Sequence, residues 1–168
     1  MPAHPLHDML TRVIGELGQR FGTIAFAPHV TLCSGKWTAG LDDLVGKVDR
    51  LSCVLQPTTM ASNGFGWGDK KTTFFYLRLD DDAATPLFTQ AKRALPGSHT
   101  PKIGAHLSLI YAKQTAPIDR KSLAGELADR VPKQIDFGQL QLVTPVETAR
   151  ESERWITRHS VQLVPAVT

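Results

Sequence analysis

One short pattern with the residue types for catalysis occurs twice in this chain. Residues 29–32 read His-Val-Thr-Leu, and residues 106–109 read His-Leu-Ser-Leu. In both copies a histidine is followed by an aliphatic residue, a hydroxyl residue and a leucine. Because side chains alternate between the two faces of a strand, a strand would place the imidazole and the hydroxyl of each copy on one face. The two aliphatic side chains would then point into a core.

Two imidazoles and two hydroxyls suit the hydrolysis of a cyclic phosphodiester. One group must take a proton from water and another must protonate the leaving ribose oxygen. An imidazole titrates near neutrality, so one neutral and one protonated histidine can coexist. Thr31 and Ser108, together with backbone N–H groups, could hold the non-bridging oxygens as charge develops. A single strand histidine is more often structural, but the repetition in separate halves of the chain favours function. This chemistry requires no metal, and no spacing in the sequence supplies the third ligand of a zinc site.

The elements that must position these residues are a mixture of helices and strands. Apolar residues recur at helical spacing in four segments, residues 7–21, 41–51, 85–95 and 118–130. Strands are expected at residues 24–33, 53–56, 59–61, 72–79, 106–111, 134–144 and 155–164. The glycine-rich residues 63–68 are expected to form a turn. Because the strands are joined by loops as often as by helices, the sequence predicts an α+β fold with mostly antiparallel sheets.

Length and composition narrow the class of protein. The 168 residues suffice for one domain with a sizeable core. No apolar run is long enough to span a membrane and no signal peptide is recognisable, so we expect a cytoplasmic protein with no membrane partner. The net charge of +3 favours a small anionic substrate, whereas the scattered lysines and arginines argue against a long nucleic-acid groove. Cys33 and Cys53 are the two cysteines, and we expect both to be free thiols.

At its two motifs the chain resembles the two-histidine (2H) phosphoesterase superfamily, and within it the cyclic nucleotide phosphodiesterases of plants and yeast. Residues 26–32, Phe-Ala-Pro-His-Val-Thr-Leu, are similar to the first family motif with its lead-in. The second motif is matched by Thr-Pro at residues 100–101 and His-Leu-Ser-Leu-Ile-Tyr at residues 106–111. Residues 140–164, which include Trp155, are similar to the last pair of strands of the family. The resemblance implies one bilobal domain over residues 1–168, with an antiparallel sheet and helices in each lobe. The lobes would be related by a pseudo-two-fold axis, with one motif in each and a cleft between them.

The resemblance also implies an activity and a role for each site residue. The activity is the metal-independent and cofactor-independent hydrolysis of small cyclic phosphates by a monomer. Nucleoside 2',3'-cyclic phosphates and ADP-ribose 1'',2''-cyclic phosphate are the expected substrates. His29 and His106 would form the acid/base pair, Thr31 and Ser108 would hold the phosphate, and Tyr111 would assist there. The sequence does not fix which histidine is the base, although we lean towards His106.

The chain departs from the family pattern in two places. Members usually begin with a strand that carries an aromatic residue for the substrate base, just before a Leu-Pro or Met-Pro pair. Here the sequence starts at Met1-Pro2, which puts that strand and its aromatic platform in doubt. The RNA-ligase-like branch commonly has an arginine just after its motifs, whereas Cys33-Ser34 and Ile110-Tyr111 stand here. That difference favours the cyclic phosphodiesterase branch.

Two alternatives remain open from the sequence. The same histidines could process RNA ends or join them in a 2'-5' ligation, and a longer basic groove would favour that reading. A non-catalytic module that binds a nucleotide or RNA is the alternative from another class. For stacking on a purine base we expect Trp37 or Trp67, which lie beside Lys36 and in the glycine-rich segment. Of the remaining histidines, His4 and His7 are expected at the surface and His159 in a structural role.

Overall fold

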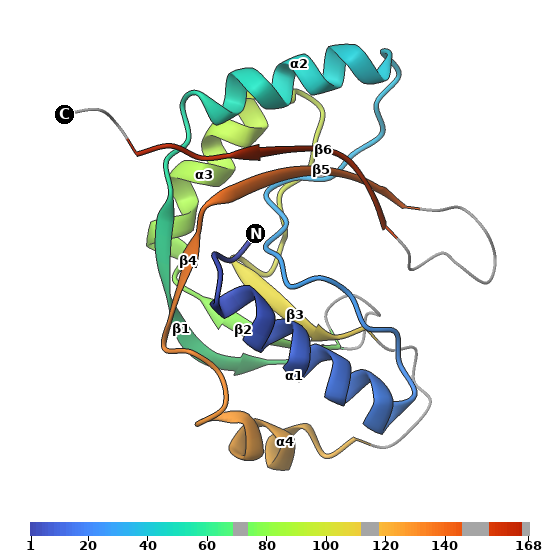
Figure 1. Ribbon diagram of the computed structural model, residues 1–168, viewed down its shortest axis with the longest axis vertical. Coiled ribbons are helices and arrows are strands. Elements are labelled where there is room, and N and C mark those ends of the chain that lie inside the picture. The colour runs from blue at the N-terminus through green and yellow to red at the C-terminus, as the bar shows by residue number, and fades with distance from the viewer. Residues whose placement is uncertain (69–73, 112–117, 146–154, 166–168) are drawn as a thin grey trace.

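The computed structural model describes residues 1–68, 74–111, 118–145 and 155–165. These residues form four helices and six strands (Figure 1). The helices are α1 (Leu6–Phe21), α2 (Leu41–Ser52), α3 (Asp81–Ala94) and α4 (Arg120–Leu127). The strands are β1 (Thr58–Gly66), β2 (Phe75–Leu79), β3 (His106–Ile110), β4 (Gln134–Phe137), β5 (Gln139–Pro145) and β6 (Trp155–Gln162). The expected α+β class is confirmed.

The strands form two separate antiparallel sheets. One sheet has four strands in the order β3-β2-β1-β4 and curls around α1, whereas the other consists of β5 and β6 (Figure 1). The extended residues 1–3 lie along the free edge of β4, where Pro2 bridges Phe137 and the N–H of Ala3 donates to the carbonyl of Asp136. In the four-stranded sheet β3 is therefore the strand at the other edge.

The four-stranded sheet and α1 enclose the larger hydrophobic cluster. The buried residues of α1 are Leu10, Val13, Ile14 and Leu17, which recur at the spacing of one helical face. They pack with Leu77 of β2 and Leu107 of β3. The helix ends at Gly22, whose positive φ of 64° lets its N–H return to the carbonyl of Gly18.

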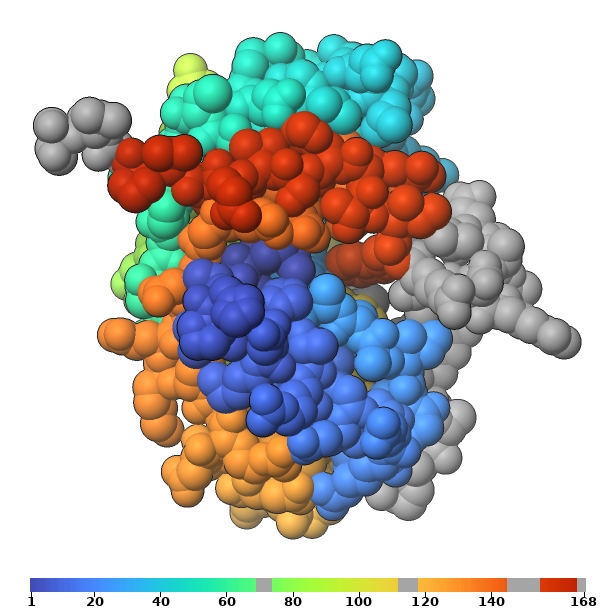
Figure 2. Space-filling model, in the orientation of Figure 1, coloured from blue at the N-terminus to red at the C-terminus, as the bar shows by residue number. Residues whose placement is uncertain are grey.

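A smaller cluster lies between α2, α3 and the β5–β6 sheet. Its buried members are Leu51, Leu55 and Ala91, and Leu32, Leu140 and Leu163 pack against them. His159 of β6 adds a polar tie to α2, because its Nε2 lies 2.6 Å from a carboxylate oxygen of Asp49. Figure 2 shows β6 as a band across the molecule, with α2 on one side and α1 on the other.

Several expected boundaries are wrong. Residues 24–33 form no ladder but only an isolated bridge at Val30, with a second bridge just beyond them at Ser34, and Pro28 cannot donate to a ladder. The expected strand at 53–56 is the turn that follows α2. The expected turn begins instead as strand, because β1 continues to Gly66. Residues 134–144 divide at Gly138 into β4 and β5.

α3 begins earlier than its apolar spacing indicated. The carboxylate of Asp80 accepts a hydrogen bond from the N–H of Asp82, which caps the first turn. Other expectations hold: Cys33 and Cys53 are free thiols. None of the helices in the described residues is long and apolar enough to cross a membrane.

Candidate active site

The two motifs lie side by side at the edge of the four-stranded sheet. Val30 forms an antiparallel bridge with Leu107, so the first motif runs along the free edge of β3. In this register the neighbours of Val30 face the neighbours of Leu107. His29 is therefore opposite Ser108, and Thr31 is opposite His106. The histidine of each motif lies beside the hydroxyl residue of the other.

The next strand, β2, extends this arrangement on the other side of β3. Its Tyr76 pairs with Ser108 and its Arg78 pairs with His106. Directly opposed residues share a face of a sheet. Two rows of side chains thus cross one face, Tyr76–Ser108–His29 and Arg78–His106–Thr31. The intervening Leu77 and Leu107 point to the opposite face and are completely buried.

Both catalytic candidates are held by the backbone in the same way. Nδ1 of His29 lies 2.7 Å from the carbonyl oxygen of Ala27, and Nδ1 of His106 lies 3.0 Å from that of Gly104. A carbonyl oxygen can only accept, so Nδ1 carries the proton in both rings. The Nε2 atom of each ring is left as the acceptor of the neutral form or the second donor of the imidazolium. Each motif therefore presents Nε2 for proton transfer.

Tyr111 connects the two motifs. Its hydroxyl lies 3.3 Å from Nε2 of His29 and also receives a hydrogen bond from the side chain of Ser108. Burial raises the pKa of Tyr111 to about 12, so the hydroxyl keeps its proton at neutral pH and can donate to His29. Ser108 is itself only 4 % exposed. The Ser108 hydroxyl, which is expected to bind phosphate, is therefore buried beneath the other side chains of the site.

The surroundings of His29 disfavour its charged form. Burial lowers the pKa of His29, and a positive charge on His106 acts in the same direction, although the hydrogen bond to Ala27 opposes both. His29 is consequently mostly neutral at pH 7 in the unliganded protein. A neutral ring with its proton on Nδ1 is the form that accepts a proton at Nε2.

Aromatic rings surround His29. Phe26 stacks on Tyr111 with ring centroids 4.0 Å apart, and the ring of Trp155 lies 4.5 Å from that of His29. Trp155 comes from β6, is 39 % exposed and also lies 6.4 Å from the Tyr111 ring. Sequence reasoning placed Trp155 only in the last pair of strands and gave it no role in the site. The alternation of residues along β6, in which Trp155 is the first residue, gave no sign of this contact.

The tryptophans expected to stack on a base make other contacts. Lys47 of α2 places its ammonium group over the Trp37 ring, and Trp67 stacks on Phe75. Among the described residues, their ring contacts do not include a motif histidine. The expectation that one of them stacks on a base stays untested, and Trp155 is the tryptophan that the structure brings to His29.

Two further residues of β2 lie at the site: Arg78, which sequence reasoning missed, and Tyr76, which the sequence indicated chiefly as a packing residue that could edge a cleft. The edge of the Tyr76 ring packs on His106, with centroids 5.3 Å apart. The ring lies over Gly66, where an added Cβ would come within 2.5 Å of ring carbons. The guanidinium of Arg78 lies near Gly64, and its side chain is exposed. Alternation along residues 75–79 places both side chains on one face, which is a signal that the sequence did contain.

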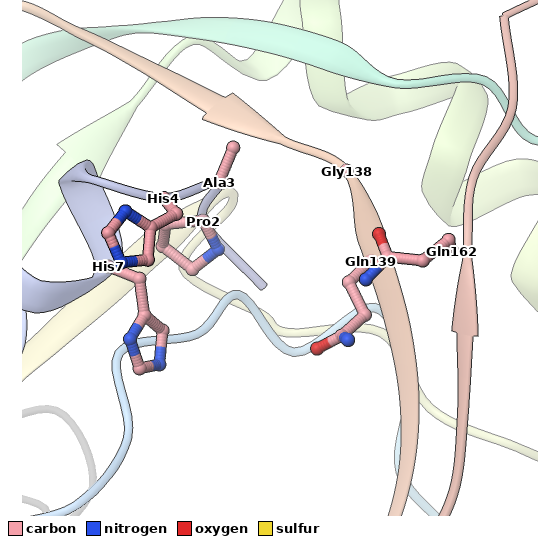
Figure 3. A pocket seen from close by; sticks show the side chains of 7 residues that line it. All are labelled: Pro2, Ala3, His4, His7, Gly138, Gln139 and Gln162. Carbon is pink, nitrogen blue, oxygen red and sulfur yellow. The ribbon is translucent and has the colours of Figure 1, made fainter.

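A separate pocket lies near the N-terminus and contains none of these residues. Its volume is about 430 Å³, and it lies between the start of the chain and the β4–β6 region (Figure 3). The lining residues are Pro2, Ala3, His4, His7, Gly138, Gln139 and Gln162. Within the described ranges, no three or more His, Cys, Asp or Glu side chains gather in a group that could hold a metal ion.

Comparison with known proteins adds no identification. No model of a protein family matches the chain, and no curated protein is a significant match to it.

Proposed function

We propose that this protein is a metal-independent two-histidine phosphoesterase that hydrolyses small cyclic phosphates. The observation that carries the proposal is the antiparallel bridge between Val30 and Leu107. It puts both motif histidines beside both motif hydroxyls, and the backbone holds the two imidazoles in the same tautomer. Independent strand histidines have no reason to share these features.

The reaction is an in-line attack of water on the cyclic phosphate. One imidazole takes a proton from water through Nε2 while the water oxygen forms a bond to phosphorus. The bond from phosphorus to one ribose oxygen breaks, and the other imidazole, as imidazolium, gives that oxygen its proton. The products are a phosphomonoester and a free hydroxyl. Proton exchange with solvent then restores the two rings.

Three hydroxyl groups and the positive charge of Arg78 would bind the phosphate. Thr31 lies beside His106 and Ser108 beside His29, so each non-bridging oxygen can meet one hydroxyl. The phenol of Tyr111 adds a donor at the His29 end. Arg78, across from His106, provides a positive charge at the other end of the same face. These donors suit a compact anionic substrate.

The aromatic side of the site suits a nucleoside. Trp155 presents an exposed ring next to His29, and base–aromatic stacking requires a ring of this kind. Nucleoside 2',3'-cyclic phosphates and ADP-ribose 1'',2''-cyclic phosphate both combine a base with a cyclic phosphate on a ribose-type ring. We therefore propose these two classes as substrates.

The two hydrophobic clusters support the bilobal arrangement of this proposal. Leu107 and Leu109 of the second motif belong to the larger cluster, whereas the first motif lies between the clusters, with Val30 against the larger one and Leu32 against the smaller one. The motifs then meet where two lobes join, and the substrate would bind in a cleft at that junction.

The test is product formation from a panel of nucleoside 2',3'-cyclic monophosphates with EDTA present. We expect turnover in the wild type and a loss of about 10²-fold or more in both His29→Ala and His106→Ala. His99→Ala, which changes an exposed histidine outside the motifs, serves as the matched control and should keep full activity. Activity that persists in both folded motif variants would contradict the proposal.

Other outcomes of the same panel would point to the alternatives. Wild-type protein that binds a cyclic nucleotide and forms no product would favour a binding module. Protein that is inactive on the nucleotides but processes RNA ends with the same two histidines would favour an RNA-processing enzyme.

A further inference from the structure

A carboxylate lies behind His106 on the far side of a single peptide unit. The carbonyl oxygen of Gly104 accepts the Nδ1–H of His106 at 3.0 Å. The N–H of the same peptide, which belongs to Ala105, donates to Oδ1 of Asp81 at 2.7 Å. The chain of hydrogen bonds therefore runs from imidazole through one peptide to carboxylate.

The local structure is built to allow this contact. Asp81 is the first residue of α3, which follows β2 directly, and Leu79 at the end of β2 donates its N–H to the carbonyl of Ala105. Gly104 has a φ of 78°, in the left-handed region that favours glycine. A Cβ on Gly104 would lie 2.5 Å from the Asp81 carboxylate. Glycine at this position thus provides both the backbone conformation and the space for the carboxylate.

The first motif has no equivalent. His29 donates to the carbonyl of Ala27, and the nitrogen of that peptide belongs to Pro28. Proline has no N–H, so no carboxylate can bind that peptide in the same manner. The two histidines share a tautomer but differ in what lies behind the carbonyl that fixes it.

We propose that Asp81 is a positioning residue for His106, acting through the Gly104–Ala105 peptide. Its carboxylate polarises the peptide, strengthens the hydrogen bond from Nδ1 and stabilises the protonated form of His106. His29 lacks this support. The importance for catalysis rests on the proposed function, whereas the coupling between carboxylate and imidazole does not.

The other groups that face His106 determine how much this carboxylate matters. Arg78 and Tyr76 face the ring from β2, Thr31 lies opposite it in the first motif, and His29 is near enough for the two charges to interact. Arg78 brings a positive charge to the face of the sheet that holds His106, and Asp81 brings a negative charge behind it. Asp81 is exposed, so its effect is partly screened.

The test compares Asp81→Asn with Asp82→Asn. An amide oxygen at position 81 can still accept the Ala105 N–H, so the variant keeps the geometry and loses the charge. Asp82 is also exposed in the first turn of α3, and its substitution makes the same change in charge without the peptide contact. Proton NMR follows the titration of each histidine ring, and the pH profile of kcat/KM follows the reaction.

We expect the His106 ring to titrate about half a pH unit lower in Asp81→Asn, the size of one partly screened charge, and to move much less in Asp82→Asn. The limb of the pH profile that belongs to His106 should move in the same direction. A shift of the acid limb would identify His106 as the base, and a shift of the alkaline limb would identify it as the acid.

Equal titration of His106 in wild type, Asp81→Asn and Asp82→Asn would overturn the proposal. So would equal shifts in both variants, because Asp81 would then act only as one more charge at a helix N-terminus. If the wild type hydrolyses no cyclic phosphate, the proposed function fails, but the NMR titration still decides whether Asp81 and His106 are coupled.

Discussion

His29 and His106 occupy equivalent places in one register, yet their surroundings differ. Around His29 lie the rings of Phe26, Tyr111 and Trp155. Around His106 lie the ring of Tyr76, the paired residue Arg78 of β2 and, through a peptide, the carboxylate of Asp81. His29 therefore has three aromatic rings around it, whereas His106 has one ring and two charged residues.

A repeated motif therefore does not make a symmetric site. The four residues of each motif fix where an imidazole and a hydroxyl point. The residues just before the motif, with Pro28 in one case and Ala105 in the other, decide whether a carboxylate can act on the ring. Neighbouring strands then add an aromatic surface on one side and charge on the other. An acid and a base need such unequal settings.

The prediction of greatest magnitude concerns Tyr111, which contacts His29 of one motif and Ser108 of the other. Burial raises the pKa of Tyr111 from an ordinary 10 to about 12, so the folded protein keeps a proton that the unfolded chain loses. The stability from this group is fully present below about pH 10 and is lost as the pH rises through about 12. The free energy of unfolding lost over this pH range is roughly 2–3 kcal/mol.

Replacing Tyr111 by phenylalanine should abolish this loss of stability at alkaline pH. In Tyr111→Phe the melting temperature should fall less between pH 10 and 12 than in the wild type. Tyr76→Phe, which changes the other tyrosine of the chain, should retain the full alkaline loss. Parallel curves of melting temperature against pH for wild type and Tyr111→Phe would show that Tyr111 is not buried in this way.

A smaller effect is expected when only the aromatic side of the site is changed. Replacing Trp155 by alanine removes the exposed ring beside His29, and we expect KM for adenosine 2',3'-cyclic phosphate to rise about 10-fold, with a much smaller change in kcat. Trp155→Phe should restore most of the affinity. Trp67→Ala is the matched control, because Trp67 is similarly exposed but stacks on Phe75. Equal increases of KM in both alanine variants would argue against a specific stacking site.

The smallest effect should appear on the polar side. Arg78→Gln removes one exposed charge opposite His106, and we expect KM to rise about threefold and to depend less on salt. Arg93→Gln, an equal change of charge in the last turn of α3, controls for the net charge of the protein. Equal changes of KM in the two variants would mean that Arg78 acts only through the net charge of the protein.

The sequence was informative where local pattern and long-range packing agree. The alternation within residues 106–110 and the helical spacing of Leu10, Val13 and Leu17 correctly predicted β3 and α1. The repetition of the motif singled out the residues that the Val30–Leu107 bridge brings together. Both inferences depend on residues close in sequence.

The features that the sequence did not predict depend on contacts between residues far apart in the chain. Gly64 and Gly66 read as turn residues, but Tyr76 packs on the bare backbone of Gly66, and that contact keeps the segment in β1. Trp155 and Asp81 reach the site from elements far from either motif in the chain. No local pattern indicates which face of β6 meets His29, or that a helix begins behind Gly104.

The bridge between Val30 and Leu107 also bears on when the proposed activity can appear during folding. Neither half of the chain holds both imidazoles, so the two motifs meet only after a long loop has closed. Folding that depends on pairing between distant segments is slow compared with the formation of a helix such as α1. During refolding, the recovery of turnover should therefore lag behind the recovery of helical circular dichroism, and catalysis reports the last long-range contacts to form.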